Sequence, residues 1–164
     1  VILEAYDELV NGPPANFAVI PYISMHGSTR EMVDHLVSAL VARNVKVAPY
    51  DLTVTDLGQL AMALVDAATV VLGSPTVLGG AHPQAAYAAS LANALRPKAS
   101  YASVIGSYGW AGGAAEALVA MMPALRVEIV DPVLVRGKPR AEDLAAVDVL
   151  ADAIAQHHRD DGLI

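Results

Sequence analysis

The stretch FAVIPYISMHGST, residues 17–29, decides the expected fold. Residues 17–23 form an apolar run suited to a buried strand, and residues 24–29 form a short loop of hydroxyl side chains around one glycine. A loop of this kind between a strand and a helix directs backbone N–H groups, hydroxyls and the positive end of the helix to one point. The stretch therefore predicts a phosphate cradle.

The loop also narrows the ligand. It has no lysine, which a P-loop requires, and it lacks the three spaced glycines of a dinucleotide fingerprint. We therefore expect a mononucleotide such as FMN, although Ser and Thr also serve as ordinary helix caps. The residues expected to hold the phosphate are Ser24, Met25, His26, Gly27, Ser28 and Thr29.

Composition limits the classes of protein to which the chain can belong. Its 164 residues suit one domain, and 55% hydrophobic with 16% charged residues suits a sheet covered by helices on both faces. A net charge of −7 argues against a nucleic-acid partner. No apolar run is long enough for a membrane span, so no membrane partner is expected. The absence of cysteine excludes disulfides and fits a cytoplasmic protein.

Apolar runs alternate with amphipathic segments along the chain. The predicted strands are residues 17–23, 45–50, 69–73, 102–106 and 127–135. The predicted helices are residues 28–43, 55–66, 83–95, 111–122 and 140–158. Strands and helices that alternate in this way predict an α/β fold with a right-handed, doubly wound parallel sheet.

Three parts of the chain carry more specific expectations. Pro21 lies in a strand that should be central, so we expect a distorted ladder or a bulge there. Residues 1–10 have the pattern of a helix end and residues 11–14 break it, so residues 1–14 are predicted to be a linker or the end of a preceding segment. An ordinary N-terminal helix packed on the domain is the alternative. His157 and His158 are expected in a solvated tail.

Two further loops follow predicted strands and combine hydroxyls with glycine or proline. Parallel sheets bind ligands at the carboxyl ends of their strands, so these loops should meet the first. The candidate residues of the second loop are Ser74, Pro75, Thr76, Val77 and Gly79. Those of the third are Ser107, Tyr108, Gly109, Trp110, Gly112 and Gly113. Trp110 is expected to cover a flat ring, with a place in the core as the alternative.

These loops resemble a known family. GSYGWAGGA, from Gly106, closely resembles the third FMN loop of the A-type flavoproteins (flavodiiron proteins). GSPT, from Gly73, resembles their second loop, and SMHGST resembles their phosphate loop. The resemblance covers about residues 15–156 and implies a flavodoxin-like five-stranded sheet of order 2-1-3-4-5. It makes residues 15–164 a flavodoxin-like FMN-binding domain, and residues 2–6 are similar to the chain that leads out of the family's metal domain.

The resemblance also implies a function. Such a domain relays electrons from a redox donor protein, or from a reduced nicotinamide or deazaflavin system, to a di-iron site that reduces O2 or NO. The five histidines are scattered and no metal ligands or catalytic residues are assigned, so the di-iron domain is expected in cis or in trans. A homo-oligomer is expected for the parent protein. The alternatives are a free-standing flavodoxin or NAD(P)H-quinone reductase, and an FMN-less interaction module.

Overall fold

The computed structural model describes residues 2–164, without the side chains of residues 8 and 9. The strands are β1 (Ala15–Tyr22), β2 (Lys46–Asp51), β3 (Ala67–Gly73), β4 (Thr76–Val77), β5 (Gly80–Ala81), β6 (Tyr101–Tyr108), β7 (Glu128–Ile129) and β8 (Val133–Arg136). The helices are α1 (Ile2–Asn11), α2 (Ser28–Ala42), α3 (Leu57–Val65), α4 (Pro83–Leu95), α5 (Ala114–Ala120) and α6 (Ala141–Asp160). None of the described helices is long and apolar enough to cross a bilayer.

The main sheet is parallel and runs in the order β2-β1-β3-β6-β7, with β8 also paired to β6. The predicted fold class and order 2-1-3-4-5 are therefore confirmed, with β7 and β8 together as the fifth strand. The predicted single strand over 127–135 is wrong in detail, because it is broken between β7 and β8. Pro132 lies in this break, and proline has no N–H to donate to a ladder.

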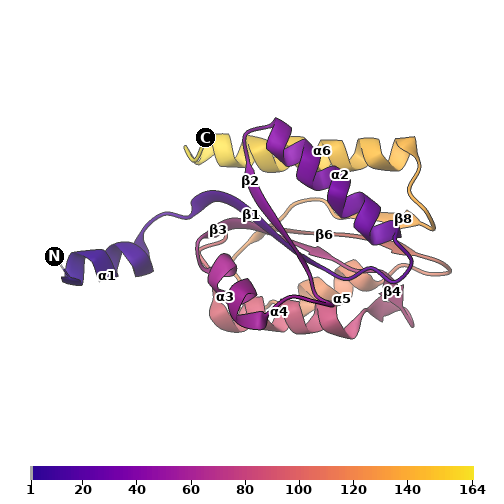
Figure 1. Cartoon of the computed structure of the whole chain (residues 1–164), viewed down its shortest axis with the longest axis horizontal. Coiled ribbons are helices and arrows are strands. Elements are labelled where there is room, and N and C mark those ends of the chain that lie inside the picture. Colours follow the sequence, from indigo (N-terminus) through magenta and orange to yellow (C-terminus); the bar gives the residue numbers. More distant parts are fainter. Residues whose placement is uncertain (1) are drawn as a thin grey trace.

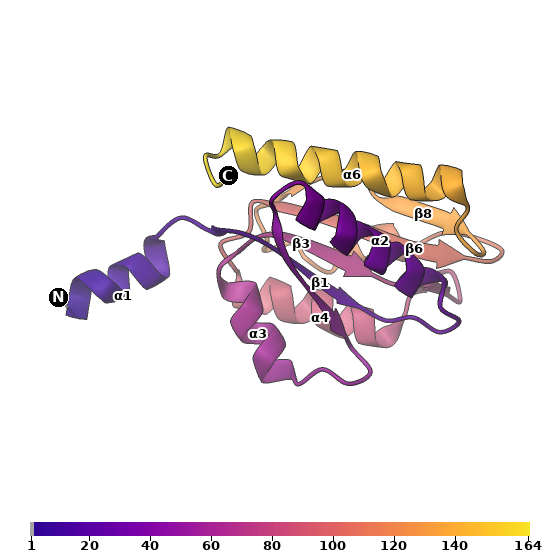
Figure 2. The ribbon, with the colours of Figure 1, turned by 45° about the horizontal axis from the view of Figure 1, so that its top comes forward.

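Helices cover both faces of the sheet. Helices α2 and α6 lie on one face, and α3, α4 and α5 lie on the other (Figures 1 and 2). Neighbouring side chains of β1 serve opposite cores: Ile20 joins the cluster under α2 and α6, whereas Val19 joins the cluster under α3 and α4. Every residue of β3 is buried. A strand covered on both faces needs this continuous apolar sequence.

Pro21 does not produce the expected bulge. The register of β1 with β2 is continuous through Pro21, which lies opposite Tyr50. The irregularity of β1 lies between Ala15 and Ala18, where its register with β3 shifts. Proline removes a single donor on one side of a strand. The register of β1 with β3 is the same on either side of Pro21, since Val19 pairs with Val70 and Tyr22 with Gly73.

The expectation of a solvated tail at His157 and His158 is wrong. Helix α6 continues to Asp160, and the His158 side chain is fully buried. Its Nε2 lies 2.7 Å from Thr69 Oγ1, and its Nδ1 lies 2.8 Å from Asn16 Oδ1. The imidazole therefore joins α6 to the start of the sheet, and burial lowers the pKa of His158.

Helix α1 is set apart from the rest of the chain, which it joins through residues 12–14 (Figure 1). The predicted N-terminal helix is thus present over Ile2–Asn11, while residue 1 lies outside the described residues. Large apolar side chains of α1 are exposed: Ile2, Leu3, Tyr6 and Val10. The alternative, in which this helix packs on the domain, is not the arrangement seen.

Candidate functional site

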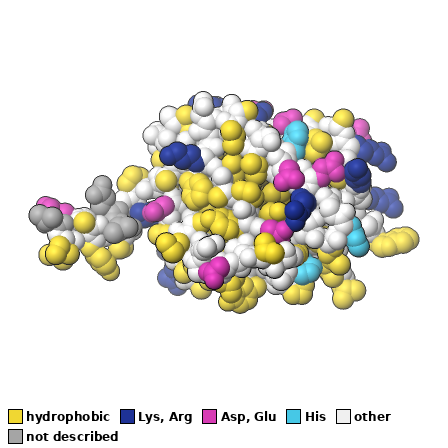
Figure 3. All heavy atoms as spheres, viewed as in Figure 1, with side chains coloured by type: hydrophobic (Ala, Val, Ile, Leu, Met, Phe, Trp, Pro, Cys, Tyr) yellow, Lys and Arg dark blue, Asp and Glu magenta, His cyan; other side chains and the backbone are white. Residues whose placement is uncertain are grey.

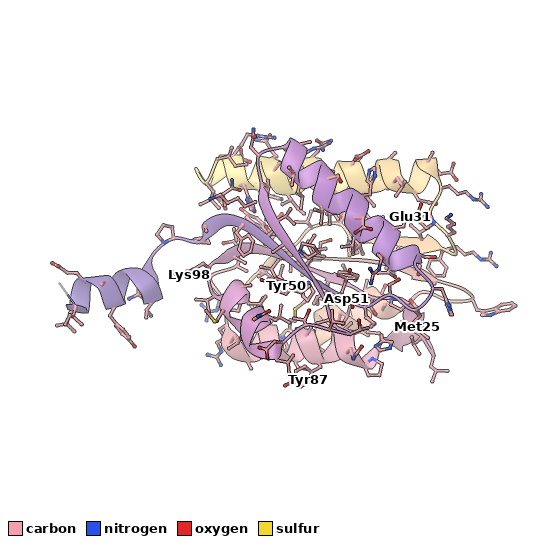
Figure 4. The ribbon with its side chains drawn as sticks, viewed as in Figure 1. Met25, Glu31, Tyr50, Asp51, Tyr87 and Lys98 are labelled. Carbon is pink, nitrogen blue, oxygen red and sulfur yellow. The ribbon has the colours of Figure 1, made fainter. Side chains whose placement is uncertain are left out.

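The three predicted loops meet at the carboxyl edge of the parallel strands. They surround a cavity of about 430 Å³. The predicted residues that line it are Ser24, Met25, His26, Ser28, Thr29, Pro75, Thr76, Val77, Ser107, Tyr108 and Gly109. Figure 4 shows Met25 and Glu31 toward this end of the molecule and Lys98 toward the other. The site is therefore built where the sheet topology places it.

The first loop presents free backbone donors. Gly27 has a φ of 90°, a left-handed conformation that glycine adopts without strain. The Ser24 hydroxyl accepts hydrogen bonds from the N–H groups of Gly27 (3.1 Å) and Arg30 (3.3 Å). The N–H groups of Ser28 and Thr29, at the start of α2, have no partner in the described structure. A helix start with two free N–H groups attracts an anion.

Thr29 connects the first loop to the third. Its side chain is 1% exposed, and its hydroxyl oxygen lies 3.4 Å from that of Ser107. Both residues also line the cavity. The start of α2 and the end of β6 thus hold two hydroxyls side by side, ready to bind a ligand oxygen.

The second loop has one structural hydroxyl and one without a partner. Ser74 is fully buried, and its hydroxyl donates to the Pro75 carbonyl (2.8 Å) and accepts from the His82 N–H (3.0 Å). Gly106 lets this loop pack closely, since a Cβ there would collide with the Ser74 carbonyl oxygen. The buried Thr76 hydroxyl, on the cavity wall, has no protein partner. Buried polar atoms are rarely left unpaired. Among the described residues the hydroxyls of Thr76 and Ser103 are both buried without a partner, and of these two residues only Thr76 lines the cavity.

Some of the predicted residues lie outside the lining of the cavity. They are Gly27, Ser74, Gly79, Trp110, Gly112 and Gly113. Gly113 lies against the Gly79 backbone, where a Cβ on Gly113 would collide with the Gly79 carbonyl oxygen, so the missing side chain of Gly113 lets the second and third loops touch. The Trp110 side chain is 99% exposed. Helix α5 begins at Ala114 rather than at residue 111, after the glycines of this loop.

Sequence reasoning missed Gly137 and Lys138, which also line the cavity. They follow β8, and the Gly137 N–H donates to the Tyr108 carbonyl at 2.9 Å. Lys138 Nζ lies 4.0 Å from Glu31 Oε2 on the first turn of α2. The available signal was RGKPR, residues 136–140, which places three cations after the last strand of an acidic chain.

Arg30 does not line the cavity, and its guanidinium forms an ion pair with Asp51, the last residue of β2. Burial raises the pKa of Asp51, but hydrogen bonds from Thr53 and the charge of Arg30 outweigh this, so the pKa lies below its ordinary value. Arg30 also lies 5.9 Å from the centre of the Tyr22 ring. The hydroxyls and N–H groups of the loop remain the anion donors.

The donor set fits a flavin mononucleotide. Free N–H groups and hydroxyls gather at the start of α2, and Thr76, whose buried hydroxyl has no partner in the described structure, lines the cavity. Val77, Tyr108 and Gly109 also line the cavity, and apolar walls with a few polar groups suit a flat heterocycle. Within the described residues, no group of three or more His, Asp or Glu side chains is placed to hold a metal.

Comparison with known proteins agrees with this geometry. No family model matches the chain. The structure superposes on an archaeal flavodoxin with a TM-score of 0.76 and 25% identity, covering 87% of this chain and 99% of the flavodoxin. The fold and the site together define a flavodoxin-like domain.

Two relatives specify the kind of flavodoxin-like domain. Rubredoxin oxygen:oxidoreductase from Desulfovibrio gigas superposes with a TM-score of 0.91 and 26% identity over 96% of this chain and 40% of its own. The nitric oxide reductase of Moorella thermoacetica is 34% identical over 156 residues, 94% of this chain and 39% of the relative. The chain spans about two fifths of these relatives and corresponds to the C-terminal flavodoxin-like region of the flavodiiron proteins.

Proposed function

We propose that this chain binds FMN and is the electron-transfer domain of a flavodiiron-type oxidoreductase. The observation that carries the proposal is the cavity at the carboxyl edge of the sheet, with the unpartnered Thr76 hydroxyl and the free N–H groups of Ser28 and Thr29. When bound, FMN supplies the electron-accepting and electron-donating chemistry, and the protein supplies binding and orientation.

Each loop has its own task in this proposal. The N–H groups at the start of α2 and the hydroxyls of Ser24 and Thr29 hold the phosphate, with support from the helix dipole. Thr76 donates its hydroxyl proton to a polar atom of the ligand. Tyr108 and Gly109 form the wall beside the ring and exclude water from that side. Trp110 is proposed to fold over the ring when the ligand is bound.

The electrons are proposed to pass to a di-iron site in another domain or in a second chain. The exposed apolar side chains of α1, including Ile2 and Tyr6, support a contact with such a domain, because an amphipathic helix normally buries its apolar face. We assign residues 1–14 to that connection and residues 15–164 to the FMN domain. The names of two relatives, a nitric oxide reductase and a rubredoxin-oxygen oxidoreductase, support NO or O2 as the terminal acceptor. We further propose that the parent protein is a cytoplasmic homo-oligomer.

Titration of the purified chain with FMN tests the proposal. We expect one FMN per chain, a yellow protein and quenched flavin fluorescence. The same chain should not oxidise NADPH with a quinone as acceptor, which a self-contained NAD(P)H-quinone reductase would do. If the chain takes up no FMN, the proposal is contradicted, and the result favours the alternative of an interaction module without FMN.

A further inference from the structure

Lys138 brings a cation to the flavin cavity from a distant part of the chain. It follows β8, and among the described residues that line this cavity it is the one lysine or arginine. Figure 3 shows Lys and Arg side chains gathered at the end of the molecule where β8 leads into α6. The first loop supplies hydroxyls and N–H groups but no lysine of its own. A negatively charged ligand in this cavity would therefore meet its cation in Lys138.

The backbone holds Lys138 in place on both sides. The Gly137 N–H donates to the Tyr108 carbonyl at 2.9 Å, which ties the loop to the end of β6. The next residue, Pro139, is buried, and its ring fixes its own φ. The Lys138 side chain, by contrast, is 80% exposed. The base of the residue is therefore fixed at the cavity, while the ammonium group is free to change partners on its flexible stem.

The ammonium group has only a loose partner within the protein. Lys138 Nζ lies 4.0 Å from Glu31 Oε2, the outer limit of an ion pair. By contrast, Lys98 Nζ lies 3.1 Å from Asp66 Oδ1, and the Lys98 side chain is mostly buried. An exposed, long ion pair contributes little free energy, so an anion of higher charge can displace the Glu31 carboxylate.

Glu31 also shows that the ammonium group lies near the expected phosphate position. Glu31 is in the first turn of α2, and the start of this helix carries the free N–H groups of Ser28 and Thr29. Residues three apart on a helix are neighbours, with about 5–6 Å between their Cβ atoms, so Glu31 lies beside Ser28. A lysine side chain that reaches Glu31 from the cavity wall can therefore also reach an anion at the start of α2.

We propose that Lys138 binds the phosphate of FMN and makes the site selective for FMN over riboflavin. This inference rests on the proposed function and adds a cation to its phosphate site. A phosphate monoester carries about −1.5 to −2 charges at pH 7. It attracts the ammonium group more strongly than one carboxylate does, so Lys138 exchanges Glu31 for the phosphate when FMN binds. Lysine suits this exchange, because it binds phosphate as a mobile point charge.

Titrations with FMN and with riboflavin test the role of Lys138, because riboflavin lacks the phosphate. Lys138→Gln should bind FMN about fivefold more weakly at low salt and should bind riboflavin as the unaltered chain does. The loss should shrink at high salt, and Lys138→Arg, which keeps the charge, should retain most of the affinity. Arg140→Gln is the matched control, because Arg140 is an exposed cation of the same loop that does not line the flavin cavity. Its affinity for either flavin should change by less than about twofold.

The phosphorus NMR resonance of bound FMN reports the contact directly. This resonance should move in Lys138→Gln and stay in place in Arg140→Gln. Equal weakening of FMN and riboflavin by Lys138→Gln would assign the side chain to the ring or to the loop fold and overturn the proposal. Unchanged FMN affinity would overturn it as well, and so would equal losses in Lys138→Gln and Arg140→Gln, which would reduce the effect to net charge.

Failure of the proposed function has a different result. If neither flavin binds, the FMN site is refuted, and a titration with inorganic phosphate then decides the role of Lys138. Amide chemical shifts of Ser28 and Thr29 would follow that titration. Weaker phosphate binding in Lys138→Gln than in Arg140→Gln would support the contact between Lys138 and an anion, and equal binding would overturn it.

Discussion

At the scale of single residues, hydroxyl groups dominate the candidate site, and their states differ. The Ser74 hydroxyl donates to the Pro75 carbonyl, and the Ser24 hydroxyl accepts a hydrogen bond from the Gly27 N–H in its own loop. The Thr76 hydroxyl has no partner. The sequence identifies all three as candidates but does not distinguish them. The distinction depends on which backbone groups the folded loops bring within hydrogen-bond distance.

Thr29→Val tests the phosphate site. The variant keeps the shape of the buried side chain but removes its hydroxyl, which lies beside Ser107 at the cavity wall. A hydrogen bond to a charged group contributes about 1.5–3 kcal/mol, so FMN affinity should fall by about tenfold or more. Ser38→Ala is the matched control, because that hydroxyl, also on α2, donates only to the Asp34 carbonyl. If a fluorescence titration gives the Thr29→Val variant and the unaltered chain the same affinity for FMN, Thr29 does not bind the phosphate.

Trp110, the only tryptophan, reports on the third loop by its own emission. Its 99% exposure predicts the red-shifted emission of a solvated indole in the FMN-free chain. Since we propose that the ring folds over the flavin, FMN should shift this emission to shorter wavelength and quench it. Trp110→Ala should then bind FMN only modestly more weakly, because the phosphate loop is intact. Emission that stays solvent-like in the complex would place Trp110 on an outer surface.

At the scale of elements, close backbone contacts shape the site as much as its polar groups do. The second loop can pack on β6 only because residue 106 has no side chain. The β4–β5 hairpin likewise meets the third loop through two glycines, Gly79 and Gly113. These approaches join segments far apart in sequence into one cavity wall.

Gly106→Ala tests this packing. The added Cβ would collide with the Ser74 carbonyl oxygen, a backbone atom that moves only if the whole loop shifts. Overpacking of this kind costs about 1–3 kcal/mol of the free energy of unfolding, and FMN affinity should fall with it. In the control, Gly80→Ala, the nearest atom to the added Cβ is 3.9 Å away. Chemical denaturation of both variants supplies the comparison, and matching midpoints would show that the loop adapts freely.

At the scale of the whole molecule, two termini of the domain are joined by one buried imidazole. His158 near the end of α6 contacts Asn16 in β1 and Thr69 in β3. Burial lowers its pKa, the charge of Asp161 partly opposes this, and His157 adds to the lowering. The folded chain therefore keeps His158 neutral at a pH where an unfolded chain would protonate it.

This difference predicts a pH-dependent stability. Below the ordinary pKa of 6.5, the unfolded chain binds a proton that the folded chain does not, so the free energy of unfolding falls as the pH falls. The loss ends once the pH passes below the folded-state pKa, and above 6.5 this group contributes no slope. Urea unfolding of the FMN-free chain over this range should show the slope, and His158→Gln should flatten it. His26→Gln, at an exposed loop position, should keep the slope; flattening by both variants would assign it elsewhere.

Sequence patterns predicted most of the architecture because local rules govern it. Apolar runs without charges specify strands buried on both faces, and residues at helical spacing specify the covering helices. The position of the first loop was predictable for the same reason, since a hydroxyl-rich turn between a strand and a helix is specified within six consecutive residues. The prediction for Pro21 was wrong because a strand ladder tolerates one missing donor. The prediction for His158 was wrong because a polar residue near the end of a helix can still face the sheet.

The sequence by itself determined the doubly wound sheet, its strand order through the family resemblance, and the three loops that surround the cavity. Only the tertiary structure decided which residues of those loops line the cavity: it buried Ser74, exposed Trp110 and added Lys138 from the loop after β8. The physical reason is that chain-local preferences fix where strands end. The direction of each side chain at that edge depends on backbone contacts between segments dozens of residues apart.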